Sequence, residues 1–160
     1  DVIRRKLPDV RIIAEDLGYL TDDVKALLRA SGFPGMKVLQ FAFDSREESD
    51  YLPHNYTQNS VVYTGTHDNN TTADWAHSAT AGDEAFSRRY LDVDGGADFT
   101  RRFIRAALAS VSDTAVIPMP DWLGLGAEAR INTPSTLGGN WLWRMDPAAL
   151  TDALAADILA

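Results

Sequence analysis

The sequence VRIIAEDLGYLTDDVKALLRASGFPGMKVLQFAFD, residues 10–44, decides the fold class because it holds one complete strand–helix–strand unit. Val10 to Ala14 is short and rich in β-branched residues, which predicts a buried strand. Thr21 can cap a helix and Gly32 can end one, so we predict a helix between them. Met36 to Phe43 predicts a second strand. Two strands joined through a helix pair in parallel.

The same alternation continues along the rest of the chain. A charged and polar stretch, residues 45–59, contains Pro53 and predicts a long loop. We predict strands at Ser60 to Thr64 and Thr114 to Met119, and helices at Thr71 to Ser78, Asp83 to Leu91, Asp98 to Ser110 and, from a cap at Asp146 and Pro147, to about Ile158. Four strands alternating with helices predict an α/β fold with a parallel sheet. A complete eight-stranded βα barrel needs about 250 residues, so the pattern fits half a barrel or an open doubly wound sheet.

Length, charge and cysteine content narrow the functional classes. A chain of 160 residues is ordinarily one domain, and its formal net charge of −8 speaks against nucleic-acid binding. The lack of cysteine excludes disulfides and thiolate metal sites and agrees with a cytoplasmic protein. No apolar run reaches about 18 residues, so we expect no membrane partner. Asp1 to Lys6 lacks a signal-peptide layout and resembles the end of a helix, so we expect a chain cut from a longer protein.

Carboxylates follow each of the four predicted strands. They stand at Glu15 and Asp16, Asp44, Asp68 and Asp121. Functional groups of parallel sheets collect at the carboxyl ends of the strands, so these residues predict an acidic pocket. The alternative is that each carboxylate caps the helix that follows it. An acidic pocket of this kind fits glycosidic-bond cleavage, in which one carboxyl group is the acid/base and another the nucleophile.

Six blocks of sequence carry a more specific resemblance. In order along the chain they are Ile12 to Gly18, Gly32 to Asp44, Tyr51 to Tyr56, Val62 to Asn69, Leu123 to Pro134 and Gly139 to Arg144. Together they resemble the 4-alpha-glucanotransferase family, also called amylomaltase or disproportionating enzyme. The chain departs from the family pattern at Asn70, at Ala73-Asp74-Trp75 and at Ser135. These departures bear on local contacts with the acceptor sugar.

The resemblance implies a fold and a set of site residues. Residues 1–160 would be a single C-terminal fragment of the catalytic domain, the second half (about four βα units) of a TIM-type (β/α)8 barrel. Glu15 would be the general acid/base, and Asp68 would stabilise the transition state by gripping sugar hydroxyls. The further contacts to substrate would come from His67, Asp44 and Asn132.

The resemblance also implies what this chain lacks. The family's nucleophilic aspartate lies in an Arg-x-Asp motif at the end of the fourth strand. Only Asp1 and Asp9 precede Glu15 among the aspartates, and neither has that context. We therefore expect the isolated chain to be inactive and its half-sheet to self-associate through open edges.

The family reaction moves alpha-1,4-glucan segments between maltooligosaccharides with retention of configuration. We expect no cofactor and no metal. Aromatic rings commonly form platforms for sugars, and the candidates here are Trp75, Trp122, Trp141, Trp143, Tyr51 and Tyr56. Ordinary packing is the alternative for each ring.

Two other functions remain open at the level of sequence. One is a metal-dependent barrel hydrolase using His67 and Asp68, although no His-x-His or His-Glu-x-x-His spacing is present. The other is a non-catalytic carbohydrate-binding unit, since a pocket without its nucleophile can still hold sugar.

Overall fold

The structure is a computed structural model that describes residues 2–18, 20–94 and 98–160. The strands are β1 (Gly35–Val38), β2 (Ser60–Tyr63) and β3 (Thr114–Val116). The helices are α1 (Val2–Lys6), α2 (Asp22–Ser31), α3 (Thr72–Ser78), α4 (Ala81–Tyr90), α5 (Phe99–Leu108), α6 (Met119–Trp122) and α7 (Asp152–Leu159). Short 3₁₀ turns occur at Leu39–Phe41, Pro53–Asn55, Ala127–Ala129 and Pro147–Ala149.

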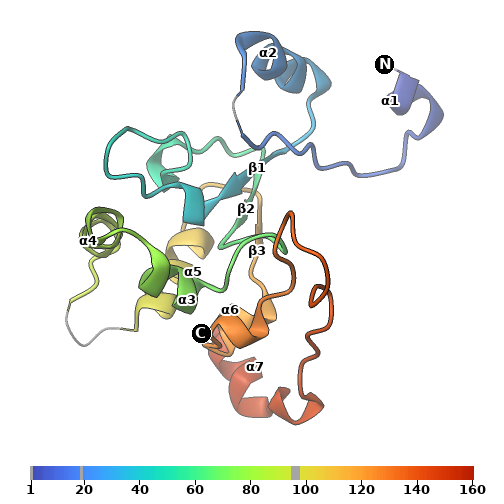
Figure 1. Cartoon of the computed structure of the whole chain (residues 1–160). Helices are drawn as coiled ribbons and strands as arrows, with labels where there is room; N and C mark the ends of the chain where they lie inside the picture. The colour runs from blue at the N-terminus through green and yellow to red at the C-terminus, as the bar shows by residue number, and fades with distance from the viewer. Residues whose placement is uncertain (1, 19, 95–97) are drawn as a thin grey trace.

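The three strands form one parallel sheet in the order β1-β2-β3 (Figure 1). Gly35 pairs with Ser60 across β1 and β2, and Val61 pairs with Thr114 across β2 and β3. Helices α3, α4 and α5 connect β2 to β3, whereas the connection from β1 to β2 contains only the 3₁₀ turns Leu39–Phe41 and Pro53–Asn55. The prediction of an α/β fold with a parallel sheet is therefore confirmed.

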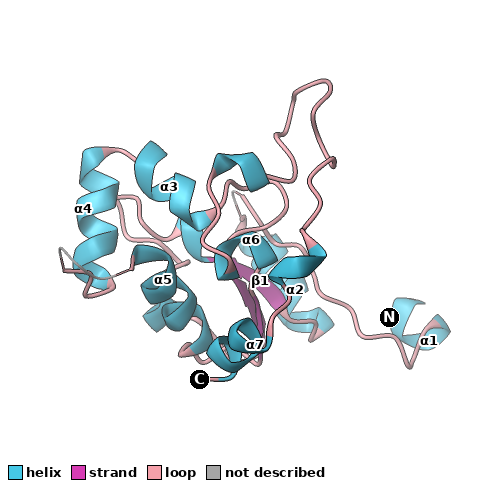
Figure 2. Ribbon diagram, turned by 90° about the horizontal axis from the view of Figure 1, so that it is seen from below, coloured by secondary structure: helices cyan, strands magenta, loops and turns pink. Residues whose placement is uncertain are grey.

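The helices are distributed unevenly around this sheet. Figures 1 and 2 show α3, α4 and α5 gathered on one side, with α2 beyond the β1 end and α1 farther out. Both α3 and α6 pack against α5. The two ends of the chain lie far apart in both views. Within the described residues, no helix is long and apolar enough to cross a membrane.

The core lies between the sheet and the α3–α5 layer and centres on Phe43, which is 2% exposed. Its ring packs against four others with centroid distances between 5.6 and 5.9 Å, those of Trp75, Phe86, Tyr90 and Phe103. Tilted and edge-on arrangements of this kind add about 0.5–1.5 kcal/mol per pair beyond the burial of area. The core thus fixes the segment that follows β1 against three helices.

The predicted second strand ends earlier than expected. β1 stops at Val38, and the chain continues into the 3₁₀ turn Leu39–Phe41. Leu39, Ala42 and Phe43 are all buried, a spacing of three and four that suits a helical turn and not the alternation of a strand. Gln40 is also buried, and its side chain donates to the Asn70 carbonyl at 2.8 Å.

The predicted first strand is reduced to a single bridge between Ala14 and Gly35. The Ala14 amide donates to the Pro34 carbonyl at 2.9 Å. Two residues later, the Asp16 carboxylate accepts the Met36 amide at 2.6 Å. This side-chain hydrogen bond takes the place of a backbone bond between strands. The prediction of a regular strand at Val10 to Ala14 was wrong.

Of the predicted helix-ending residues, Gly32 is confirmed, while the predicted caps Thr21 and Asp146 differ from expectation. Gly32 ends α2 in the left-handed conformation at φ 65°, and Asp98 caps α5 by accepting the Arg101 amide at 3.2 Å. Thr21 occupies the N-cap position of α2, although its side chain makes no capping bond. Asp146 caps only the 3₁₀ turn, and the last helix begins at Asp152 under a cap from Thr151.

Candidate functional site

The loop after β2 forms a tight turn that presents His67 and Asp68. Asn69 Oδ1 accepts from the amide of Thr66 at 2.9 Å and from its hydroxyl at 2.8 Å, and the Asn69 amide donates to the Thr66 carbonyl at 3.1 Å. The Asp68 amide donates to Thr66 Oγ1 at 3.3 Å. The side chains of His67 and Asp68 are left 55% and 48% exposed, so both are accessible to a ligand.

Asp68, His67 and Asn132 meet beyond the carboxyl end of β2. Asn132 Nδ2 donates to Asp68 Oδ1 at 2.6 Å, and His67 Nε2 lies 3.3 Å from the same oxygen. Among the described residues, none donates a hydrogen bond to Asp68 Oδ2, so this oxygen is available to a sugar hydroxyl. The structure therefore brings together three of the five residues predicted for the site.

Trp141 adds an aromatic ring to this cluster. Its indole lies against the His67 imidazole with a centroid distance of 5.1 Å and an interplanar angle of 38°. The backbone of Trp141 has a positive φ of 63°, and its amide donates to the Ile131 carbonyl at 2.7 Å. A bulky residue in this conformation costs about 1–3 kcal/mol, so surrounding contacts must hold it in place. Trp141 is 56% exposed beside the predicted sugar-binding residues.

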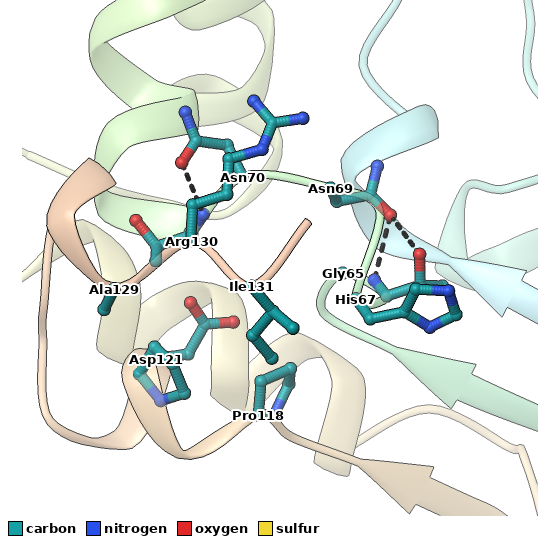
Figure 3. Close-up of a pocket in the computed structure, with 12 residues that line it drawn as sticks. Gly65, His67, Asn69, Asn70, Pro118, Asp121, Ala129, Arg130 and Ile131 are labelled. Carbon is teal, nitrogen blue, oxygen red and sulfur yellow. Dashed lines mark hydrogen bonds between the residues drawn. The ribbon is translucent and has the colours of Figure 1, made fainter. Parts of the chain in front are cut away.

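Arg130 joins the backbone on both sides of the cluster; it lies in the block Leu123 to Pro134, but no role was predicted for it. Its Nη2 donates to the Asp68 carbonyl at 3.0 Å and its Nε donates to the Asn132 carbonyl at 2.9 Å. Arg130 also lines a small cavity of about 20 Å³ next to the cluster. In Figure 3, Asp121 and Arg130 lie on one side of this cavity and His67 on the other.

Asp121 is a structural residue, which corrects the expectation that all four strand-end carboxylates form an open acidic pocket. It is 2% exposed. Its Oδ2 accepts the hydroxyls of Thr64 and Thr72 at 2.5 and 2.9 Å, and its Oδ1 accepts the Thr72 amide at 2.7 Å. Thr72 is the first residue of α3, so the carboxylate caps that helix from across the fold and ties it to the end of β2.

We expect Asp121→Ala to lower the free energy of unfolding by about 2–4 kcal/mol, because it leaves three buried donors without their acceptor. Urea denaturation monitored by circular dichroism measures this change. Asp113→Ala is the matched control, since Asp113 is exposed and should shift stability by no more than about 0.5 kcal/mol. Equal effects of the two substitutions would contradict the structural role of Asp121.

Asp44 lies at the start of the loop after β1 and is bound to Arg46. Arg46 Nη2 and Nε reach the two carboxylate oxygens at 2.6 and 2.8 Å, and the Arg46 amide adds a bond at 2.9 Å. These bonds lower the pKa of Asp44 to about 2. Because this pKa is lower than in an unfolded chain, the pair stabilises the fold above about pH 4 and loses this effect as the pH falls toward 2. The substrate contact predicted for Asp44 stays a prediction.

Glu15 has an exposed side chain that lines a groove of about 540 Å³ between α1 and α2. The apolar walls of this groove include Val2, Ile3 and Leu27. The neighbouring Asp16 is buried, and a Cβ placed on Gly35 would stand only 2.6 Å from its carboxylate. Asp16 is therefore a structural residue, while Glu15 is left accessible.

Four of the six aromatic platform candidates have surroundings that separate them into two groups. Trp75 stacks on Phe99 at 6.0 Å and belongs to the core, and Tyr56 is 8% exposed. Trp122 lies under Arg101, whose guanidinium stands 5.4 Å from the ring. Only Trp141 among these four adjoins the Asp68 cluster, so packing explains the others.

A metal-dependent hydrolase would need several ligating side chains grouped around one point. In the part of the chain that the structure describes, no three His, Asp or Glu side chains are grouped so that they could hold a metal ion. His54 hydrogen-bonds to the Tyr90 hydroxyl at 2.8 Å, and His77 to the Ala73 carbonyl at 2.7 Å. His67 is the one histidine beside a predicted site carboxylate.

Comparison with known proteins identifies the family. A family model described as 4-alpha-glucanotransferase matches residues 1–151. The chain belongs to the 4-alpha-glucanotransferase family. The 4-alpha-glucanotransferase of Thermus thermophilus is 45% identical over 166 residues, covering 99% of this chain and 33% of the relative. The chloroplastic/amyloplastic enzyme of Arabidopsis thaliana is 44% identical over 157 residues, covering 98% of this chain and 27% of the relative.

A solved structure of an amylomaltase shares the fold of this chain. The amylomaltase of Streptococcus agalactiae, in complex with acarbose, matches with a TM-score of 0.90 and 41% identity. The match covers 96% of this chain and 31% of the amylomaltase. The chain thus spans between 27% and 33% of the length of these relatives. Because one of these relatives is named for the chloroplast, the cytoplasmic location stays a prediction.

Proposed function

We propose that this chain is the C-terminal part of a longer 4-alpha-glucanotransferase that acts on alpha-1,4-glucans. One observation carries the proposal. His67, Asp68 and Asn132 converge beyond the end of β2, in a chain whose fold matches an acarbose-bound amylomaltase. A carboxylate with one bound and one available oxygen suits recognition of neighbouring sugar hydroxyls.

The sheet forms the second half of a (β/α)8 barrel in the complete protein. Support comes from the parallel order β1-β2-β3 and from the bridge that places Ala14 outside β1. These segments correspond to four consecutive barrel strands, of which the first is reduced to that bridge. The strand edges at Ala14 and β3 would then pair with strands of the preceding part of the protein.

The reaction retains the configuration of the anomeric carbon and uses two carboxyl groups that come from different parts of the protein. Glu15 protonates the leaving sugar and later deprotonates the 4-hydroxyl of the incoming sugar. The nucleophilic aspartate comes from the preceding part of the protein. Asp68 binds the hydroxyls of the donor sugar more tightly as its ring approaches an oxocarbenium ion, with His67 and Asn132 orienting the carboxylate. Asp44 contributes a further substrate contact.

Product analysis of the longer parent protein tests this function. The parent should convert maltotriose into glucose and longer maltooligosaccharides, and the new linkages should have the alpha configuration in proton NMR spectra. Release of glucose without any longer product would indicate a hydrolase. Formation of beta linkages would contradict the retaining mechanism.

A non-catalytic carbohydrate-binding unit is the second candidate for the isolated chain. It is favoured by the exposed Trp141 ring beside His67 and by the open Asp68 carboxylate. Calorimetric titration of the chain with maltotetraose would detect such binding. Activity of the longer parent decides between the two functions.

We expect the 160-residue chain to self-associate. Apolar side chains near the Ala14 edge are exposed, among them Val2, Ile3, Leu27 and Ile13 at 61%, 47%, 69% and 48%. Exposed apolar surface next to an unpaired strand edge favours association with a second copy. Light scattering over a concentration series should show a rise from monomer to dimer mass. A compact monomer at the highest concentration would contradict this expectation.

A further inference from the structure

The backbones that carry Asp68 and Asn132 come from different loops, and a single guanidinium connects them. The two residues lie 64 positions apart, one after β2 and the other after the turn Ala127–Ala129. Their side chains share the 2.6 Å bond, while their carbonyls both accept from Arg130. The side-chain bond and the two guanidinium bonds close a ring that includes the carboxylate predicted to bind sugar hydroxyls.

Arg130 is itself held firmly at its base. Its amide donates to the Ala127 carbonyl at 3.1 Å, and the preceding residue, Ala129, is fully buried. The guanidinium is planar and presents its donors in a fixed fork, so it can hold both carbonyls at a set separation. An ammonium is a compact charge and lacks this fork.

We propose that Arg130 is a positioning residue that sets the orientation of the Asp68 carboxylate by fixing the carbonyls of Asp68 and Asn132. The inference rests on the proposed function, in which Asp68 grips the sugar in the transition state. Arg130 acts through Asp68 and touches no reacting atom. A displacement of about 1 Å at such a carboxylate is enough to lower turnover about 10²-fold.

Kinetics of the longer parent protein provide the first test. Arg130→Lys should lower kcat for maltotriose about 10-fold and Arg130→Gln about 10²-fold, with KM changed no more than about threefold. Arg88→Lys is the control, because Arg88 makes an ion pair with Glu84 on α4, with 2.9 Å between Nε and Oε1. A change confined to KM, or an equal loss in the control, would overturn the proposal.

A double-mutant cycle then separates positioning from a general effect on folding. If Arg130 acts only through Asp68, Arg130→Lys should cost less than about twofold in kcat once Asp68→Ala is present. A further loss of about 10-fold in that background would show that Arg130 acts independently of Asp68, which would overturn the proposal.

A measurement without activity keeps this inference distinct from the proposed function. In NMR spectra of the 160-residue chain, the side-chain amide protons of Asn132 should exchange with solvent severalfold faster in Arg130→Lys than in the parent chain or Arg88→Lys. Unchanged exchange would overturn the positioning role. If the exchange result holds while the longer protein shows no transfer activity, the proposed function fails and the structural role of Arg130 stands.

Discussion

Glu15→Gln in the longer parent protein lowers the disproportionation of maltotriose by about 10²- to 10⁴-fold, the range that general acid/base catalysis supplies. Glutamine keeps the size and polarity of the side chain but cannot donate or accept the proton. Glu15 is exposed and lines an open groove, so the substitution should leave the free energy of unfolding unchanged within about 0.5 kcal/mol. The effect therefore belongs to the chemistry and not to the fold.

An activated aryl glycoside separates protonation from the other steps. Its leaving group departs without a proton, so Glu15→Gln should retain the first step with this donor and lose the transfer to a sugar acceptor. Glu48→Gln is the matched control, because Glu48 is exposed in the loop after β1. Maltotriose turnover by Glu15→Gln within a few-fold of the parent would contradict the assignment of Glu15.

Asp68→Asn should lower kcat for maltotriose by about 10²-fold or more and leave KM within a few-fold of the parent value. The carboxylate binds the hydroxyls of the donor sugar more tightly as the ring approaches the transition state, and the neutral amide accepts weaker hydrogen bonds from them. Its partner Asn132 stays within hydrogen-bonding distance of the new side chain, so local structure should persist. Steady-state kinetics over a wide range of maltotriose concentration give both constants.

The division between kcat and KM decides what Asp68 does. A loss confined to KM would show that Asp68 binds the ground state and the transition state equally. Asp113→Asn serves as the control, since Asp113 is an exposed aspartate that precedes β3.

The fold could be predicted from the sequence where local patterns carried the information. The β2 strand, α2 and α5 follow directly from β-branched runs and capping residues. The early end of β1 was harder, because MKVLQFAF fits a strand by composition. The buried residues of this segment are Leu39, Ala42 and Phe43, which lie three and four positions apart as in a helical turn. Their burial depends on the helices that pack against the segment.

The candidate site could likewise be predicted only in part from local sequence patterns. His67 and Asp68 could be located from their place after a strand, whereas Asn132 came from the family resemblance alone. No spacing rule joins positions 68 and 132, whose contact depends on the whole fold. Asp121 was placed in the pocket by its position after an apolar run, but the hydroxyls of Thr64 and Thr72 make it a buried structural group.

We propose that this chain supplies the acid/base half of a retaining glucanotransferase whose nucleophile lies in the preceding part of the protein. The most direct test incubates maltotriose with the 160-residue chain alone, with the preceding part alone, and with the two joined as the longer parent. Glucose and longer maltooligosaccharides should form only with the joined protein, because only there do nucleophile and acid/base face one sugar. Formation of these products by the 160-residue chain alone would contradict the account.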